Sequence, residues 1–146
     1  MAGEVVVVGV GSPFGGDRTG WAVIDRLAAG EPLPGVRLER LDRPGPALIP
    51  ALGTAGRAVI VDAVRSGAAP GTLHRFTAAD RLPRTRAVSG HGLGLADALA
   101  LGERLGDLPP WVVIGVEAAP EALPPEAALE RAVRAVRAEA AAPAAG

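Results

Sequence analysis

Three side chains of this sequence are of types that bind metal ions or transfer protons, and each adjoins a segment expected to position it. Asp17 ends a glycine-rich turn that follows four valines at residues 5–8. Asp62 follows the apolar run at residues 58–61, and His91 stands between two glycines before a predicted helix. Two carboxylates and one imidazole suit a divalent cation of borderline hardness, with positions left open for a substrate. Asp17, Asp62 and His91 are therefore the candidate catalytic and metal-binding residues.

Each of these residues also has an ordinary structural interpretation. An aspartate at position 17 would be stabilised by the dipole of the helix that follows it. Asp62 would suit a turn at a strand end, and a single loop histidine such as His91 is more often a surface residue than a ligand. The hypothesis of a common site therefore depends on a fold that brings all three to one edge of a sheet.

Other chemistries fit the sequence less well. A dinucleotide-binding fingerprint needs a glycine three residues after Gly11, where none occurs, and a P-loop needs a lysine, which the chain lacks. A serine hydrolase would combine Ser12 or Ser89 with His91 and Asp62, but the sequence has no Gly-x-Ser-x-Gly motif. These two nucleotide-binding motifs are thereby excluded, and the serine hydrolase is a weak alternative.

Strands and helices alternate along the predicted chain. Apolar runs and period-two patterns predict strands at residues 4–10, 36–41, 58–61, 72–76 and 111–116, and helical spacing predicts helices at residues 21–30, 46–52 and 93–105. A last helix carries Leu129, Ala132, Val133 and Val136 on one stripe. This order predicts an α/β fold: a three-layer, doubly wound, mainly parallel twisted sheet with helices on both faces. Such folds bind ligands beyond the carboxyl ends of their strands.

Composition narrows the class of protein. The 146 residues, with formal net charge −1 and no cysteine, predict one domain at residues 1–139 and a frayed alanine-rich tail at 140–146. The 15 basic and 16 acidic residues are spread along the chain, so no basic surface indicates nucleic acid. No apolar run is long enough for a membrane span, and no signal peptide is evident. We expect a cytoplasmic protein with neither nucleic-acid nor membrane partners.

Three segments together resemble the hydrogenase maturation protease family, the endopeptidases of the nickel-iron hydrogenase large subunit. They are residues 9–21 (GVGSPFGGDRTGW), residues 61–72 (VDAVRSGAAPGT) and residues 89–96 (SGHGLGLA). The resemblance implies that Asp17, three residues before Gly20, is the metal-contacting acid of the first motif. Gly16 then replaces the first acid of the family's acidic pair, and Ser12 replaces its asparagine. Counting forward from Gly11 without a gap would instead put an arginine at the ligand position.

The function implied by this resemblance is a nickel-dependent endopeptidase that removes the C-terminal extension of a [NiFe] hydrogenase large-subunit precursor during maturation. Asp17, Asp62 and His91 would contact nickel supplied by the precursor rather than nickel stably bound to the enzyme. The precursor would be the partner of a monomeric protease. Two alternatives remain open: a relative that binds the precursor without cleaving it, suggested by Gly16, and a small-molecule hydrolase that uses the same crevice.

Overall fold

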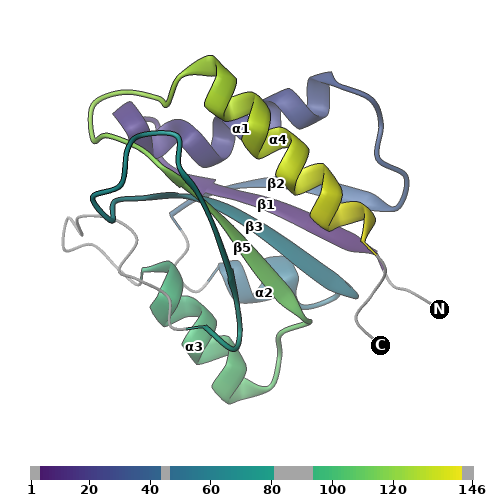
Figure 1. Ribbon diagram of the computed structural model, residues 1–146. Helices are drawn as coiled ribbons and strands as arrows, with labels where there is room; N and C mark the ends of the chain where they lie inside the picture. Colours follow the sequence, from purple (N-terminus) through teal and green to yellow (C-terminus); the bar gives the residue numbers. More distant parts are fainter. Residues whose placement is uncertain (1–3, 44–46, 81–93, 143–146) are drawn as a thin grey trace.

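The computed structural model describes residues 4–43, 47–80 and 94–142, which form five strands and four α-helices (Figure 1). A short 3-10 helix, η1, separates the first strand from the first α-helix. The elements in chain order are β1 (Val5–Gly11), η1 (Gly15–Arg18), α1 (Thr19–Ala29), β2 (Val36–Asp42), α2 (Leu48–Leu52), β3 (Arg57–Val64), β4 (Leu73–Thr77), α3 (Leu95–Leu105), β5 (Trp111–Glu117) and α4 (Glu126–Ala141).

The sheet is mainly parallel and has the order β2-β1-β3-β5-β4. Strands β2, β1, β3 and β5 run parallel, and β4 pairs antiparallel with β5 at one edge. After β1 the chain moves first to β2 on one side and then to β3 on the other, so strand order reverses between β1 and β3. The carboxyl ends of β1 and β3 therefore flank the position at which doubly wound folds bind ligands.

Helices cover both faces of the sheet and confirm the predicted three-layer α/β architecture. Figure 1 shows α1 and α4 on one face, with α2 and α3 on the other. Alternate residues of the central strands enter two separate cores, because successive side chains of a strand point to opposite faces. Val7, Val59 and Val61 pack with α1 and α4, whereas Val8 and Ile60 pack with α2 and α3. The uninterrupted valines of β1 are thus buried on both sides.

Two glycines allow helix α1 to lie directly on the central strands. A Cβ atom at Gly20 would lie 2.3 Å from the Val10 carbonyl oxygen and 2.7 Å from the Val61 carbonyl oxygen. A Cβ atom at Gly9 would lie 2.4 Å from the Gly20 carbonyl oxygen. Real Cβ atoms do not approach backbone oxygens this closely, so the first turn of α1 depends on these two glycines for its position.

Some boundaries differ from those predicted. Strand β3 continues through Val64, so Asp62 lies inside the strand rather than after it. Helix α4 continues to Ala141, and Ala140 within the expected tail is only 7% exposed because it packs in the core under this helix. Gly106 ends α3 in the left-handed conformation at φ 70°, as its sequence position predicts. Within the described ranges, no helix is long and apolar enough to cross a membrane.

Candidate active site

The loop after β1 holds Asp17 by contacts within the loop itself. The Asp17 amide donates to the Phe14 carbonyl oxygen at 3.0 Å, and the Ser12 amide donates to the Asp17 carbonyl oxygen at 3.0 Å. The Ser12 hydroxyl is also 3.5 Å from Asp17 Oδ2, the outer limit of a hydrogen bond. Asp17 is therefore fixed at the carboxyl end of a central strand, and its side chain remains 25% exposed.

The same loop packs tightly against the segment that follows β5. The Gly16 amide donates to the Pro120 carbonyl oxygen at 3.0 Å. A Cβ atom at Gly16 would lie only 1.8 Å from the Ala119 carbonyl oxygen, and one at Gly15 would lie 2.2 Å from the Pro120 carbonyl oxygen. Gly15 also has a positive φ of 51°, a conformation that glycine adopts at little cost. Position 16 therefore has neither an acidic side chain nor the space to hold one.

Asp62 is fully buried in the neighbouring strand β3. It follows Ile60 by two residues, so strand alternation places its side chain on the face covered by α2 and α3. The Ala63 amide donates to Asp62 Oδ1 at 2.8 Å and helps to fix the carboxylate. The fold therefore places Asp17 in the loop after β1 and Asp62 on the adjacent strand β3, where strand order reverses. Asp17 is partly open to solvent, and Asp62 is enclosed.

Asp17 has an ionic partner that the sequence patterns did not predict. Arg65 Nη2 lies 2.8 Å from Asp17 Oδ1, and the side chains of the two residues are 19% and 25% exposed. Arg65 follows the last residue of β3, three positions after Asp62. It stands within a segment that resembles the protease family, but no local pattern links it to a residue 48 positions earlier. Only the pairing of β1 with β3 brings the two together.

A second polar cluster closes the turn after β3. Glu117, at the end of β5, is 3% exposed and accepts hydrogen bonds from the Ser66 amide at 2.8 Å and the Ser66 hydroxyl at 2.6 Å. The Nε2 atom of His74 lies 3.0 Å from Glu117 Oε1. Burial raises the pKa of Glu117, but the hydrogen bonds from Ser66 and His74 outweigh it, so the pKa lies below its ordinary value. The sequence patterns did not predict this cluster, although a glutamate at the end of an apolar strand could have indicated a buried polar residue.

The third candidate, His91, lies outside the described residues. Among the residues that the structure does describe, no group of three or more histidine, aspartate or glutamate side chains could hold a metal ion. Of the three proposed metal ligands, the structure thus describes the two carboxylates, and the imidazole of His91 belongs to a residue outside the described ranges. Oxygen and imidazole donors together suit Ni(II) without any thiolate.

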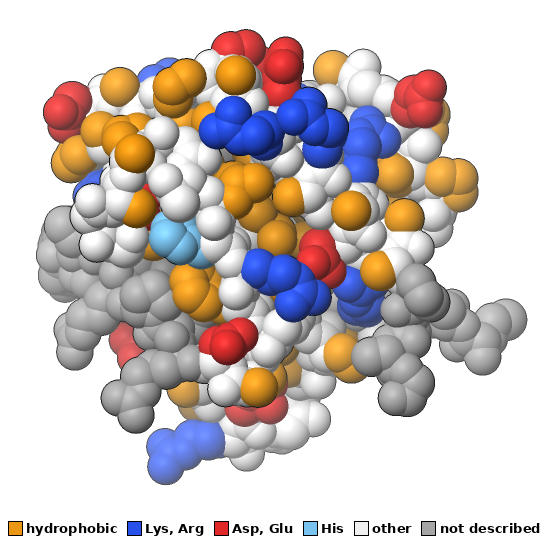
Figure 2. Space-filling model, in the orientation of Figure 1, with side chains coloured by type: hydrophobic (Ala, Val, Ile, Leu, Met, Phe, Trp, Pro, Cys, Tyr) orange, Lys and Arg blue, Asp and Glu red, His pale blue; other side chains and the backbone are white. Residues whose placement is uncertain are grey.

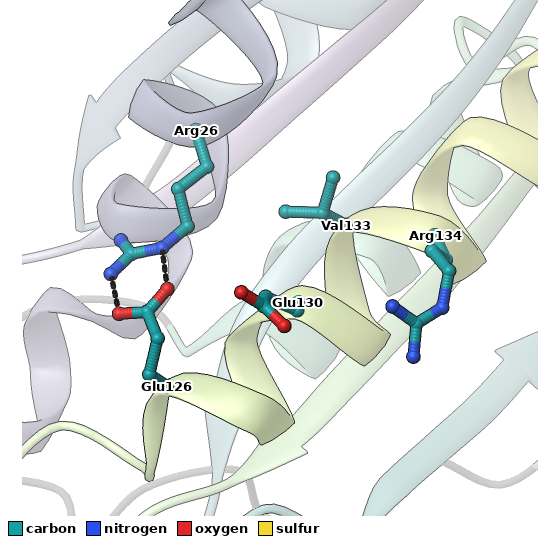
Figure 3. A pocket seen from close by; sticks show the side chains of 5 residues that line it. All are labelled: Arg26, Glu126, Glu130, Val133 and Arg134. Carbon is teal, nitrogen blue, oxygen red and sulfur yellow. Dashed lines mark hydrogen bonds and ion pairs between the residues drawn. The ribbon is translucent and has the colours of Figure 1, made fainter. Parts of the chain in front are cut away.

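A shallow pocket of about 320 Å³ lies between α1 and α4 and is separate from these candidates. Figure 3 shows Arg26 of α1 forming a two-pronged ion pair with Glu126 of α4, beside Glu130, Val133 and Arg134. Figure 2 shows arginines gathered over this helical face with acidic side chains beside them. The mixed charge is typical of a solvated helix surface, so we assign the pocket no role in the active site.

Comparison with known protein families and solved structures shows which proteins this chain resembles. The family model HycI, described as hydrogenase maturation protease, matches residues 44–145. The chain belongs to the hydrogenase maturation protease family. It is therefore an α/β protein of an endopeptidase family, and the resemblance seen in the sequence is confirmed. The matched stretch contains Asp62 and His91 but begins after the loop that carries Asp17.

Solved structures extend the relationship across the first strand and loop. The hydrogenase maturating endopeptidase HybD from E. coli is 29% identical, with 91% of this chain and 89% of that chain covered and a TM-score of 0.70. An E. coli endopeptidase studied in solution is 26% identical, with the same coverage and a TM-score of 0.76. The [NiFe] hydrogenase maturation protease HycI from Thermococcus kodakarensis is 28% identical, with 94% and 90% covered and a TM-score of 0.63. No curated protein sequence matches the chain.

Proposed function

We propose that this hydrogenase maturation protease removes the C-terminal extension of a [NiFe] hydrogenase large-subunit precursor, and that Asp17, Asp62 and His91 contact the nickel carried by that precursor. Membership of the endopeptidase family carries the proposal, together with one carboxylate in the loop after β1 and one on β3, the two strands between which strand order reverses. The enzyme would act in the cytoplasm as a monomer. Nickel would belong to the substrate and would not be a resident cofactor.

The two carboxylates are suited to different tasks. Asp62 is fully buried, and the Ala63 amide fixes one of its oxygens, so it would provide a rigid contact. Asp17 is 25% exposed, so both the metal of the precursor and the attacking water can reach it. Nickel would polarise the scissile carbonyl or the water when the precursor is bound. His91 would complete the set as a neutral imidazole donor.

Phe14 supports a docking surface beside this site. It is 66% exposed in the loop that holds Asp17, directly before η1, and only two phenylalanines occur in the chain. Large exposed aromatic side chains often anchor protein interfaces. The loop is braced by the segment after β5, so Phe14 would present a fixed apolar contact to the precursor near the cleavage position.

The direct test is incubation with purified nickel-loaded precursor, followed by intact-mass measurement of the product. We expect the wild type to release a short C-terminal peptide. Asp17→Asn, Asp62→Asn and His91→Gln should each reduce the cleavage rate by at least about a hundredfold. The matched control is Asp107→Asn, because this exposed aspartate lies before β5, at the opposite end of the strand. Full activity of any one candidate variant would remove that residue from the proposed site.

A precursor-binding protein without cleavage activity is the second candidate, favoured by the lack of both an acid and space at Gly16. Such a protein would form a stable complex with nickel-loaded precursor in size-exclusion chromatography, while the mass of the precursor stayed unchanged over hours. Release of the extension by the wild type would exclude this alternative.

A further inference from the structure

The Asp17 carboxylate is paired with a positive charge that the chain itself supplies, the guanidinium of Arg65. The Arg65 guanidinium lies 2.8 Å from Asp17 Oδ1, and roughly four fifths of each side chain is withdrawn from solvent, with 19% and 25% exposed. A guanidinium cannot lose its proton in a protein, so this charge is present at every working pH. Because the pair is largely enclosed, dissolved salt screens it less than a surface pair.

We propose that Arg65 is a specificity-determining residue that prevents Asp17 from retaining free Ni²⁺, so that Asp17 engages only metal carried by the precursor. This inference rests on the proposed function of the same site. A free dication that approached Asp17 would meet a neutralised carboxylate and a neighbouring positive charge, and both effects oppose its binding. Metal that arrives already bound to deprotonated protein ligands is less repelled, because each anionic ligand lowers the net charge of the metal complex.

The backbone on both sides of Arg65 is anchored, which keeps its guanidinium at the carboxylate. Before it, β3 is bonded into the centre of the sheet between β1 and β5. After it, the Ser66 amide and hydroxyl both bond to Glu117 at the end of β5, at 2.8 and 2.6 Å. Arg65 Nε is itself buried and makes no hydrogen bond within the described residues. Within the described residues, Asp17 is the ionic partner of this side chain.

Arg65 could instead serve only to hold the Asp17 loop in place. Loss of such a structural pair would lower stability and displace the Asp17 carboxylate, so Ni²⁺ affinity would be unchanged or weaker. Loss of a charge that repels free Ni²⁺ raises the Ni²⁺ affinity, and it does so only while the Asp17 carboxylate is present. The two roles can therefore be separated by measuring binding of the metal alone.

The experiment is a titration of the metal-free full-length protein with NiCl₂ alone, followed by isothermal calorimetry and by competition with a nickel-binding dye. Arg65→Gln should bind Ni²⁺ at least about tenfold more tightly than the wild type. The gain should vanish when Asp17→Asn is added, and Arg65→Lys should stay close to the wild type. Arg134→Gln is the control, since it removes the same charge from an exposed position on α4.

The proposal is wrong if Arg65→Gln binds Ni²⁺ no more tightly than the wild type, including the case in which neither binds measurably. It is also wrong if the gain persists with Asp17→Asn or if Arg134→Gln reproduces it. Circular dichroism and urea unfolding establish that the variants are folded, and Arg65→Met replaces Arg65→Gln if the latter is not. Failure of the wild type to cleave nickel-loaded precursor would refute the proposed function, and it would do so independently of these affinities.

Discussion

Replacement of Gly20 by alanine tests whether the close approach of α1 to the sheet positions the active-site loop. Gly20 is the second residue of α1 and follows Asp17 by three positions. Its added Cβ atom would lie 2.3 Å from one central-strand carbonyl oxygen and 2.7 Å from another, those of Val10 and Val61. Both oxygens belong to backbone inside the sheet, so neither can turn aside as a flexible side chain could. The helix must move away from the strands.

Two opposing effects set the size of the change. Alanine is favoured over glycine within a helix by about 1 kcal/mol. Overpacking of a well-packed core typically costs about 1–3 kcal/mol, and we take the upper end because both clashes are with backbone. The net expectation is a loss of about 2 kcal/mol in the free energy of unfolding. For a chain of this size that corresponds to a fall of about 4–8 °C in Tm.

Urea unfolding and differential scanning calorimetry measure this difference directly. The matched control is Gly94→Ala, because a Cβ atom there would meet nothing within 4 Å and the backbone is extended at φ −72°. The control should lose less than about 1 kcal/mol, mainly through a poorer residue at the start of α3. If Gly20→Ala proved as stable as the wild type or more so, the close packing of α1 on β1 and β3 would be refuted.

Three further predictions concern the remaining features. Glu117→Gln should lower the free energy of unfolding by about 2 kcal/mol at pH 7, because it removes charge-assisted hydrogen bonds from a buried position. The pKa of Glu117 lies below its ordinary value in the folded protein, because the hydrogen bonds from Ser66 and His74 outweigh the effect of burial. Its stabilisation is therefore complete above the unfolded-state pKa and is lost as the pH falls through the folded-state pKa. Urea titrations from pH 7 to pH 3 should therefore show the wild type and Glu117→Gln converging in acid, whereas a constant difference would contradict the assignment. Arg26→Gln should leave the urea midpoint unchanged, because its partner Glu126 is 61% exposed, and a clear destabilisation would show that this pair matters more than solvent exposure suggests. Phe14→Ser should raise KM for the nickel-loaded precursor severalfold with kcat and stability unchanged, and an unaltered KM would exclude Phe14 from docking.

The fold could be predicted from the sequence because its strongest signals are local. The four valines of β1 and the run ending at Val61 lack polar alternation, which indicates strands buried on both faces, and both are central strands. Alternation at residues 36–41 indicated an edge, and β2 lies at one edge. Element boundaries were harder to predict. Helix α4 continues into the alanine-rich end because Ala140 finds a place in the core, a tertiary effect that composition does not reveal.

The candidate site was only partly predictable, for a different reason. Asp17 and Asp62 follow glycine and valine patterns that can be read along the chain, so they could be named in advance. The ion pair between Asp17 and Arg65 spans 48 residues, and the bonds of Glu117 to Ser66 span 51. Such partners depend on which strands become neighbours, and single-sequence patterns carry little information on that choice. The roles of Asp17, Asp62 and His91 at nickel remain predictions.

The tight contact at Gly16 has a consequence for how this loop can change. A side chain there would overlap the Ala119 carbonyl oxygen at 1.8 Å, and the Gly16 amide is already bonded to Pro120. An aspartate could be accommodated at position 16 only if the segment after β5 moved at the same time. A distant part of the chain therefore keeps Asp17 as the one acid of this loop. A single substitution that introduced a second acid would be blocked, so design would have to alter both segments together.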